Sequence, residues 1–310
     1  MLTLFKKKKC LTTIGLQVSE DNLSLLVLDN SAAKPVIKDY ISHTVNTSHP
    51  IDKITQVVSE YIDQNNLTEA SCCLVLNDSD YQLLTIEAPP VPEEEMAEAV
   101  KWKIKDLLQF PVNEAIVDVF LQPDSHIEGK FMANVVVAHK ALIDKKRQYV
   151  ESIGLQLGAI DIPELAYRNY IESSSHNEKN IALVLIKKDS GKLIVVNDST
   201  VYFSRNFSVH YKGGLFDDLP ESEIVLELQR SLDYYERQLK HAIPTDIIFV
   251  GENIIEDKIT SITKDSLNQH ILVESISGYE FSDEDSMSTS NVIASYGAAL
   301  RQGLALGGAR

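Results

Sequence analysis

Residues 81–120 read YQLLTIEAPPVPEEEMAEAVKWKIKDLLQFPVNEAIVDVF, and their pattern predicts a strand, a helix and a second strand. Side chains alternate in character over 83–87, as in a half-buried strand, and the proline-rich run that follows cannot continue a sheet because proline has no N–H to donate. Pro92 suits the first turn of a helix, and the glutamates after it lie at the positive end of the helix dipole. Apolar residues then recur at helical spacing as far as Leu108, and extended structure resumes at 116–120. The segment therefore predicts an amphipathic helix packed on a small sheet.

The composition is typical of a soluble globular protein. The 310 residues are enough for about two domains, and 44% of them are hydrophobic and 24% charged. A net charge of −16 argues against nucleic acid as a partner, because its phosphates would be repelled. The three cysteines, Cys10, Cys72 and Cys73, form no CxxC motif and are typical of small core residues in a reducing compartment. No apolar run approaches the roughly 20 residues of a membrane span, so the sequence predicts a cytoplasmic protein.

A basic run, Lys6–Lys9, precedes the first expected strand. The apolar residues after it end too soon for a signal peptide. Such a run is either a solvated tail or a weak attachment to an anionic membrane surface, at about 1 kcal/mol per basic residue. That attraction is too small to anchor the chain alone, and it suits a protein that a partner already holds at a membrane.

Two strand meanders of similar length open the two halves of the chain. The first half begins with LTTIGLQV, NLSLLVLD and PVIKDYISH (11–43), and the second with NIALVLIKK, KLIVVND and STVYFSRNFSV (180–209). Helices and further strands alternate after each meander. This repetition indicates an internal duplication and an α/β architecture of two lobes. The polar loop 173–180 is the expected boundary between the halves.

Three segments give the chain a family resemblance: residues 81–120, LQRSLDYYERQL (228–239) and YGAALRQG (296–303). They resemble the PilM-like proteins of type IV pilus assembly, and among these the branch that serves the mannose-sensitive haemagglutinin (MSHA) pilus. The resemblance implies a two-lobed actin-like fold, similar to that of the cell-division protein FtsA, with an inserted subdomain in the first lobe. The implied parts are a basic tail (1–10), a first lobe (11–79 and 159–180, with the helix at 290–304 packing back on it), an inserted subdomain (80–158) and a second lobe (181–289).

The resemblance also implies a binding role at the membrane. PilM-like proteins are cytoplasmic members of the inner-membrane pilus platform, and they hold the N-terminal cytoplasmic peptide of a single-span protein of the PilN or MshJ type. Other platform and motor components, and further copies of this chain, are the remaining expected partners. We expect the peptide to lie between the first lobe and the inserted subdomain, where it would add a strand to a sheet edge. The candidate contacts are Tyr81, Leu83, Trp102, Phe110 and Val112.

The nucleotide motifs of actin-like ATPases are altered in this sequence. In those enzymes the first meander turn holds phosphate on backbone N–H groups and works with magnesium through a carboxylate, whereas the matching positions here are Gly15, Gln17 and Ser19. The second turn has Lys187 in a Leu-Ile-Lys run instead of Asp-Ile-Gly, and the adenosine turn has Gly251 followed by glutamate instead of a second glycine. These five residues are vestigial candidates for nucleotide contact. We expect no cofactor, no ATP hydrolysis, and weak or absent binding of Mg·ATP.

Two other hypotheses stay open on the sequence. The chain would be an actin-like ATPase or a nucleotide-binding switch with degenerate motifs, in which case the lysines at 187 and 188 attract phosphate instead of lying solvated. It would otherwise be an L component of type II secretion, which shares the cytoplasmic fold but continues into a transmembrane helix, whereas this sequence ends at Arg310. Asp118 and Asp161 are isolated acids at strand ends, and no HExxH, GxSxG or Walker motif indicates a metal site or other catalysis. Trp102 lies off the apolar stripe of its helix, where a tryptophan either covers a core edge or contacts a partner.

Overall fold

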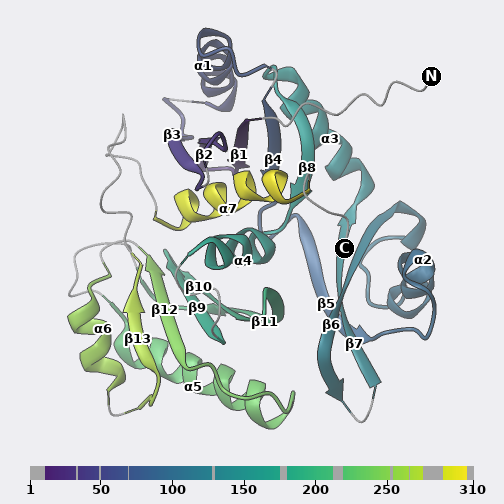
Figure 1. The fold of residues 1–310 in the computed structure, drawn as a ribbon, viewed down its shortest axis with the longest axis vertical. Coiled ribbons are helices and arrows are strands. Elements are labelled where there is room, and N and C mark those ends of the chain that lie inside the picture. The colour runs from purple at the N-terminus through teal and green to yellow at the C-terminus, as the bar shows by residue number, and fades with distance from the viewer. Residues whose placement is uncertain are drawn as a thin grey trace.

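The strands of this chain form three separate β-sheets, and the helices pack on them, as a computed structural model shows (Figure 1). The basic tail at 1–10, most of the predicted boundary loop and the residues at 275–288 lie outside the described part of the chain. No described helix has both the length and the apolar character needed to cross a membrane. The structure describes residues 11–32, 34–48, 50–68, 70–127, 130–174, 180–211, 219–251, 254–264, 266–274 and 289–305.

The first five-stranded sheet has the strand order β3-β2-β1-β4-β8. Its members are β1 (Thr12–Val18), β2 (Asn22–Asp29), β3 (Val36–Thr44), β4 (Ser71–Val75) and β8 (Gln156–Asp161). The meander pairs antiparallel, while β4 pairs parallel with both β1 and β8. Because neighbouring side chains on a strand point to opposite faces, β2 contributes Leu25 to one core and Leu26 to the other. The first core is covered by α1 (Ile51–Gln64) and α3 (Lys140–Ser152), and the second by α7 (Thr289–Ala305).

The second five-stranded sheet repeats this arrangement in the order β11-β10-β9-β12-β13. Its members are β9 (Ile181–Lys187), β10 (Ser190–Asn197), β11 (Thr200–Ser208), β12 (Asp246–Gly251) and β13 (His270–Val273). Every pairing has the same direction as its counterpart in the first sheet. On one face lie α5 (Glu221–Arg237) and α6 (Glu256–Thr263), and on the other α4 (Pro163–Ser173). The sequence repeat is therefore a repeat of the fold, with one sheet in each lobe.

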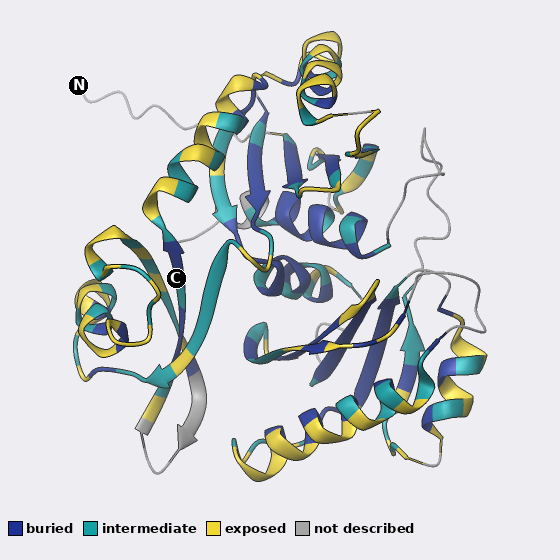
Figure 2. Cartoon of the chain, turned by 180° about the vertical axis from the view of Figure 1, so that it is seen from behind, coloured by how far each residue is buried: buried dark blue, intermediate teal, exposed yellow. Residues whose placement is uncertain are grey.

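Helices α4 and α7 lie between the two large sheets, and they touch through their backbones (Figure 1). A Cβ atom on Gly297 would lie only 1.8 Å from the carbonyl oxygen of Ala166 in α4. A Cβ atom on Gly15 in β1 would likewise lie 1.7 Å from the carbonyl oxygen of Ser295 in α7. Glycine is needed at both places because no other residue allows so close an approach. Figure 2 shows the central strands of both lobes as buried and the outer sides of the helices as exposed.

The third sheet contains the segment that opened the sequence analysis. Strands β5 (Tyr81–Glu87), β7 (Lys130–His139) and β6 (Ala115–Ile127) pair antiparallel in the order β5-β7-β6, and the short 3-10 helix η1 (Val112–Glu114) precedes β6. Helix α2 (Glu93–Ile104) covers one face. The helix ends at Ile104 rather than at Leu108, because the following turn brings Leu108 onto the sheet. The core between α2 and the third sheet contains Met96, Val100, Ile104, Val135 and Val137.

The range expected for the inserted subdomain, 80–158, includes at its C-terminal end residues that pack with the first lobe. Val150, Ile153 and Leu155 are buried in the core of the first sheet, so α3 and the beginning of β8 pack with the first lobe. The part that forms a separate sheet is 81–139. This difference arises because α3 follows β7 directly and then turns its apolar side to β1 and α1, a contact that the local sequence does not reveal.

Candidate functional site

A cleft of about 840 Å³ lies where the turns of the two meanders face each other. Pockets of this size are typical of small-molecule sites. Three of the five nucleotide candidates, Gln17, Ser19 and Lys187, line it. The other two pack inside the lobes, Gly15 against α7 and Gly251 against Ile186 and Ile254. The structure therefore brings the two altered turns together, while the two glycines serve backbone packing.

In the turn between β1 and β2, the polar groups form hydrogen bonds with one another. The N–H of Ser19 donates to the carbonyl oxygen of Asn22 at 2.8 Å, and the N–H of Asn22 donates to the Ser19 hydroxyl at 3.0 Å. The Ser19 hydroxyl in turn donates to Asp21 Oδ1 at 2.6 Å. A phosphate cradle needs backbone N–H groups that point outward. These two N–H groups are already used within the turn.

The second turn carries two lysines into the cleft. Lys187 and Lys188 both line it and are accessible to solvent. Protein atoms nevertheless surround the Lys187 ammonium on most sides, and this desolvation lowers the pKa of Lys187 below its ordinary value. Among the described residues, Lys187 has no hydrogen bond or ion pair to a side chain.

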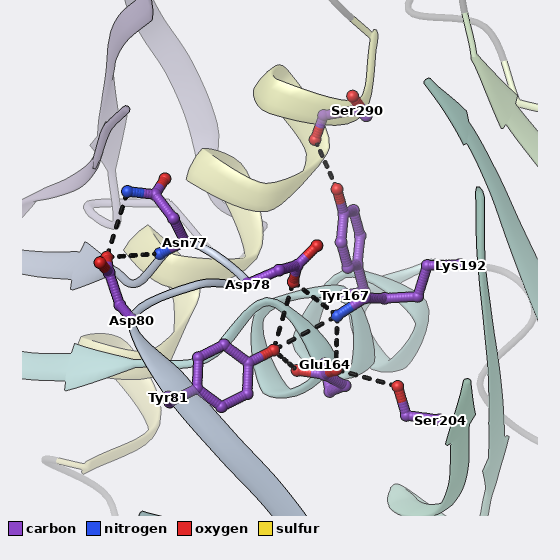
Figure 3. A network of polar contacts seen from close by, with 9 residues as sticks. All are labelled: Asn77, Asp78, Asp80, Tyr81, Glu164, Tyr167, Lys192, Ser204 and Ser290. Atoms are coloured by element: carbon purple, nitrogen blue, oxygen red, sulfur yellow. Dashed lines mark hydrogen bonds and ion pairs between the residues drawn. The ribbon is translucent and has the colours of Figure 1, made fainter. Parts of the chain in front are cut away.

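Two lining residues of the cleft, Asp78 and Lys192, belong to an ion-pair network that continues into the interior (Figure 3). Lys192 Nζ lies 2.6 Å from Asp78 Oδ1 and 2.6 Å from Glu164 Oε1. The hydroxyl of Tyr81 donates to Glu164 Oε2 at 2.5 Å and accepts from Lys192 Nζ at 3.3 Å. The hydroxyl of Ser204 donates to Glu164 Oε1 at 2.9 Å. Both oxygens of the Glu164 carboxylate therefore have partners.

The electrostatics of the network follow from its burial. The side chains of Lys192 and Glu164 are only 7% and 2% exposed, whereas that of Asp78 is 47% exposed. Burial alone opposes the charged form of Lys192, but the carboxylates of Glu164 and Asp78 outweigh it, so the pKa of Lys192 is raised. Burial, and then the same two carboxylates, raise the pKa of the Tyr81 phenol far above its usual value. The network therefore holds an ammonium ion against carboxylate, with Tyr81 as a neutral donor.

The loop between β4 and β5 fixes Asp78 from the first lobe. Asn77 donates its side-chain amide to the carbonyl oxygen of Val18 at 2.8 Å, and its N–H donates to Asp80 Oδ2 at 2.9 Å. Asp80 also pairs with Lys146 of α3 at 2.9 Å. The two acids of the loop thus point in different directions, Asp80 to the first lobe and Asp78 to Lys192 of the second.

A magnesium nucleotide in this cleft would meet the neutral amide of Gln17 at the first turn and the ammonium of Lys192 beside the second. Asp78, which lines the cleft, and Glu164 beneath it are both paired with the ammonium of Lys192, and Asp21 at the first turn is the other acid that lines the cleft. Gln17 is a neutral amide, and its Oε1 is buried without a hydrogen-bond partner in the described part of the chain. A magnesium ion requires carboxylate or phosphate oxygens that are free to coordinate it. This chain offers an ammonium ion at the same place.

A second buried ion pair corrects the expectation that Asp161 is isolated. Asp161, at the end of β8, is 1% exposed and pairs with Arg301 of α7 at 2.6 Å. Burial raises the pKa of the Asp161 carboxyl, and Arg301 partly offsets that effect. Asp118 lies exposed on β6. The pair joins the C-terminal part of α7 to the first sheet.

The five residues expected to bind a partner peptide do not form one groove. Tyr81 belongs to the cleft network, and Leu83 lies on the face of its sheet opposite α2. Phe110 packs on the α2 face, where its ring centre is 4.9 Å from that of His139. Val112 lies in η1, and Trp102 is 76% exposed on the outer side of α2. They therefore mark two separate surfaces of the inserted sheet and one position in the cleft.

The residues that sequence reasoning missed are Asp78, Glu164 and Lys192. They come from a loop, a helix and a strand that are far apart in the sequence. One signal was present: Lys192 precedes the apolar run Leu-Ile-Val-Val in a strand whose neighbours are buried. A lysine in such a strand needs a carboxylate partner.

The fold is shared with proteins of known structure. Neither a protein-family model nor a curated protein matches this sequence. A "PilM-PilN type IV pilus biogenesis complex" is similar, with a TM-score of 0.71 and 17% identity over 94% of this chain and 98% of that chain. The cytoplasmic domain of EpsL, an inner-membrane component of the type II secretion system of Vibrio cholerae, follows with a TM-score of 0.52 and 11% identity over 95% of each chain. A Bacteroides thetaiotaomicron protein described as having an actin-like ATPase fold overlaps less closely, with a TM-score of 0.49 and 10% identity over 88% of this chain and 94% of that chain. The chain thus shares its fold with the PilM–PilN structure: two α/β lobes, with a third sheet inserted in the first lobe.

Proposed function

We propose that this protein is a non-catalytic scaffold of a type IV pilus assembly platform. The observation that carries the proposal is the structural similarity to the PilM–PilN complex, which extends over 94% of this chain and includes the inserted sheet. The resemblance at 81–120, 228–239 and 296–303 supports the finer assignment, an MshI-like protein of an MSHA-type pilus. Its place would be the cytoplasmic side of the inner membrane, where partners hold it and the basic tail adds a weak attraction to anionic lipid.

The partner that we propose is the N-terminal cytoplasmic peptide of a PilN- or MshJ-like membrane protein. In the described structure β5 pairs only with β7, so its outer edge presents unpaired backbone groups. An extended peptide can add to such an edge, and pockets for alternate side chains then give specificity. Leu83, together with Val136 on β7 and Ile116 on β6, offers an apolar surface beside that edge.

A binding titration tests this partner and this surface together. The probe is a synthetic, dye-labelled N-terminal peptide of the PilN- or MshJ-like protein from the same genome, and the measurement is fluorescence anisotropy. We expect Leu83→Asp to weaken binding by at least about tenfold, because a charge would replace an apolar contact. Leu226→Asp on α5 is the matched control, since Leu226 is also a surface leucine but lies in the second lobe.

The same titration locates the binding surface on the inserted sheet. A loss of binding in Trp102→Ala with Phe110→Ala, and none in Leu83→Asp, would place the peptide on the α2 side. Binding like that of the wild type in all these variants would move the site away from the inserted sheet. No binding of the peptide to wild-type protein would contradict the proposed partner.

We also propose that the protein does not hydrolyse ATP. The internal hydrogen bonds of the first turn and the ion pairs of Asp78 and Glu164 with Lys192 support this proposal. Isothermal calorimetry with Mg·ATP is expected to show no micromolar binding, and purified protein to release no phosphate. Phosphate release would contradict the proposal, whereas a micromolar affinity would contradict the expected weak or absent binding and favour the second candidate.

The second candidate is a nucleotide-binding switch or ATPase with degenerate motifs in the same machine. The cleft of about 840 Å³, with Lys187 recessed in it, is the observation in its favour. Under this candidate, phosphate release is present in wild-type protein and lost in Gln17→Ala. The neighbouring reading frame is an independent observation: a short protein with one N-terminal membrane span would support the platform role.

A further inference from the structure

Lys192 stands where three parts of the molecule meet. It belongs to β10 of the second lobe, while Asp78 belongs to the loop after β4 of the first lobe. Glu164 belongs to α4, which lies between the lobes, and Tyr81 begins the inserted sheet. The ammonium ion of Lys192 therefore contacts side chains from the first lobe, from α4 and from the inserted sheet (Figure 3).

The ion pairs of Lys192 are short and largely buried, so breaking them is costly. Lys192 Nζ lies 2.6 Å from each of two carboxylates, and the Lys192 and Glu164 side chains are almost fully buried. Because α4 packs on the second sheet, separating the lobes would take Asp78 and Tyr81 away from Lys192 and leave it paired with Glu164. The buried Lys192–Glu164 pair would then lose the polar partners that complete its contacts, which is costly for buried charges.

A second set of contacts ties the inserted sheet to the second lobe. The side-chain amides of Gln122 and Asn134 donate to the carbonyl oxygens of Tyr202 and Val201 in β11, at 3.1 and 2.7 Å. These contacts lie on the same face of the sheet as Tyr81, farther along the strands. If the Lys192 contacts were lost, these two hydrogen bonds would still hold the inserted sheet against β11.

We propose that Lys192 is an internal cation that latches the two lobes and the inserted sheet in one arrangement. The cleft is then held closed by the protein's own side chains, and no bound ligand is needed to fix the lobes. Lys192, Glu164, Asp78 and Tyr81 are positioning residues in this role. The inference stands apart from the pilus assignment, since it rests only on the contacts within this chain.

Distances between spin labels measure the arrangement directly. The labels are placed on exposed residues of three helices, Lys53→Cys on α1, Glu94→Cys on α2 and Glu236→Cys on α5, in pairs. The background variant is Cys10→Ser, because Cys72 and Cys73 are buried and will not take a label. Pulsed electron spin resonance on the full chain then gives one distance distribution for each pair.

We expect narrow distributions in the wild type and broadened or shifted ones in Lys192→Met. Lys188→Met is the matched control, because Lys188 lines the same cleft but makes no ion pair in the described structure, and it should leave all distributions unchanged. Tyr81→Phe removes only a hydroxyl, and it should broaden the distributions that include the α2 label.

The double variant Lys192→Met with Glu164→Gln is the control for misfolding caused by an unpaired buried charge, because it removes both buried charges. If it unfolds cooperatively and still shows broadened distributions, the latch is supported. If its distributions, and those of Tyr81→Phe, are as narrow as in the wild type, the proposal is overturned. Equal broadening in Lys188→Met would also overturn it, since the effect would then not depend on the buried contacts.

Discussion

Arg301→Met tests the energetic reasoning at the Asp161–Arg301 pair. Asp161 is 1% exposed, and its Oδ1 accepts from Arg301 at 2.6 Å and from the N–H of Ile162 at 3.0 Å. Its Oδ2 is buried without a hydrogen-bond partner in the described structure. Methionine retains most of the aliphatic stem of arginine, so the substitution removes charge and hydrogen bonding more than packing.

The expected loss of stability is about 3 kcal/mol. Breaking a buried ion pair from one side costs about 3–5 kcal/mol, because a charge is left without compensation. Arg301 is 34% exposed, so water can partly replace it, and the lower end of this range applies. The double variant Arg301→Met with Asp161→Asn should lose only about 1 kcal/mol, because no buried charge remains. The coupling between the two positions should therefore exceed about 1 kcal/mol.

The pH dependence has a definite sign. Burial raises the pKa of Asp161 in the folded protein above the ordinary value of 3.8, so the folded state binds this proton more tightly than the unfolded state. Stability from this group is thus present at low pH and is lost as the pH rises through the folded pKa. Removing Arg301 raises that pKa further. The loss in Arg301→Met should therefore be larger at about pH 7 than at about pH 5.

Urea unfolding followed by circular dichroism measures these quantities. Arg147→Met on α3 is the matched control, because Arg147 makes only exposed ion pairs and should change stability by no more than about 0.5 kcal/mol. Equal losses in Arg301→Met and Arg147→Met would refute the reasoning. A double variant as unstable as the sum of the single variants would refute it as well.

Three further predictions follow from burial and close contact. Gly297→Ala should lower stability by about 1–3 kcal/mol in thermal unfolding, because its Cβ would lie 1.8 Å from a carbonyl oxygen of α4; unchanged stability would contradict that contact. Trp102 is the single tryptophan and is 76% exposed, so its fluorescence should be typical of a solvated indole and open to quenching by acrylamide; a shielded emission would contradict the exposed position. In a Cys10→Ser variant, Cys72 and Cys73 should react with a thiol reagent only after unfolding, because burial raises the pKa of both thiols; fast reaction in the native state would contradict this.

Much of the fold could be predicted from the sequence because the elements are locally marked. The two meanders have the alternating or continuous apolar patterns of strands, and their similar lengths indicated the repeat that both large sheets show. The helix at α2 was marked by Pro92 and by the spacing of its apolar residues. Its end at Ile104 was not marked, because the pattern continues to Leu108 while the tertiary contact with the sheet redirects the chain.

The candidate site was predictable only in part. Gln17, Ser19 and Lys187 were singled out from the family's nucleotide motifs, and all three line the cleft. Gly15 and Gly251 belonged to the same local patterns, but packing uses both for close approach.

The five candidate partner-binding residues show a second limit of prediction from sequence. Its five residues are near in sequence, yet the period of a strand places Leu83 on one face and the turn after α2 places Phe110 on the other.

The α/β class, the repeated meanders and the altered turns could be predicted from residue patterns, since strand and helix periods and turn residues are local properties. The position of Lys192 between Asp78 and Glu164, by contrast, depends on packing between distant parts of the chain. These three residues lie in different elements, and each alone is an ordinary charged residue. They form one network because the two sheets and α4 bring their buried ends together, and a charge that is buried needs a partner of opposite sign.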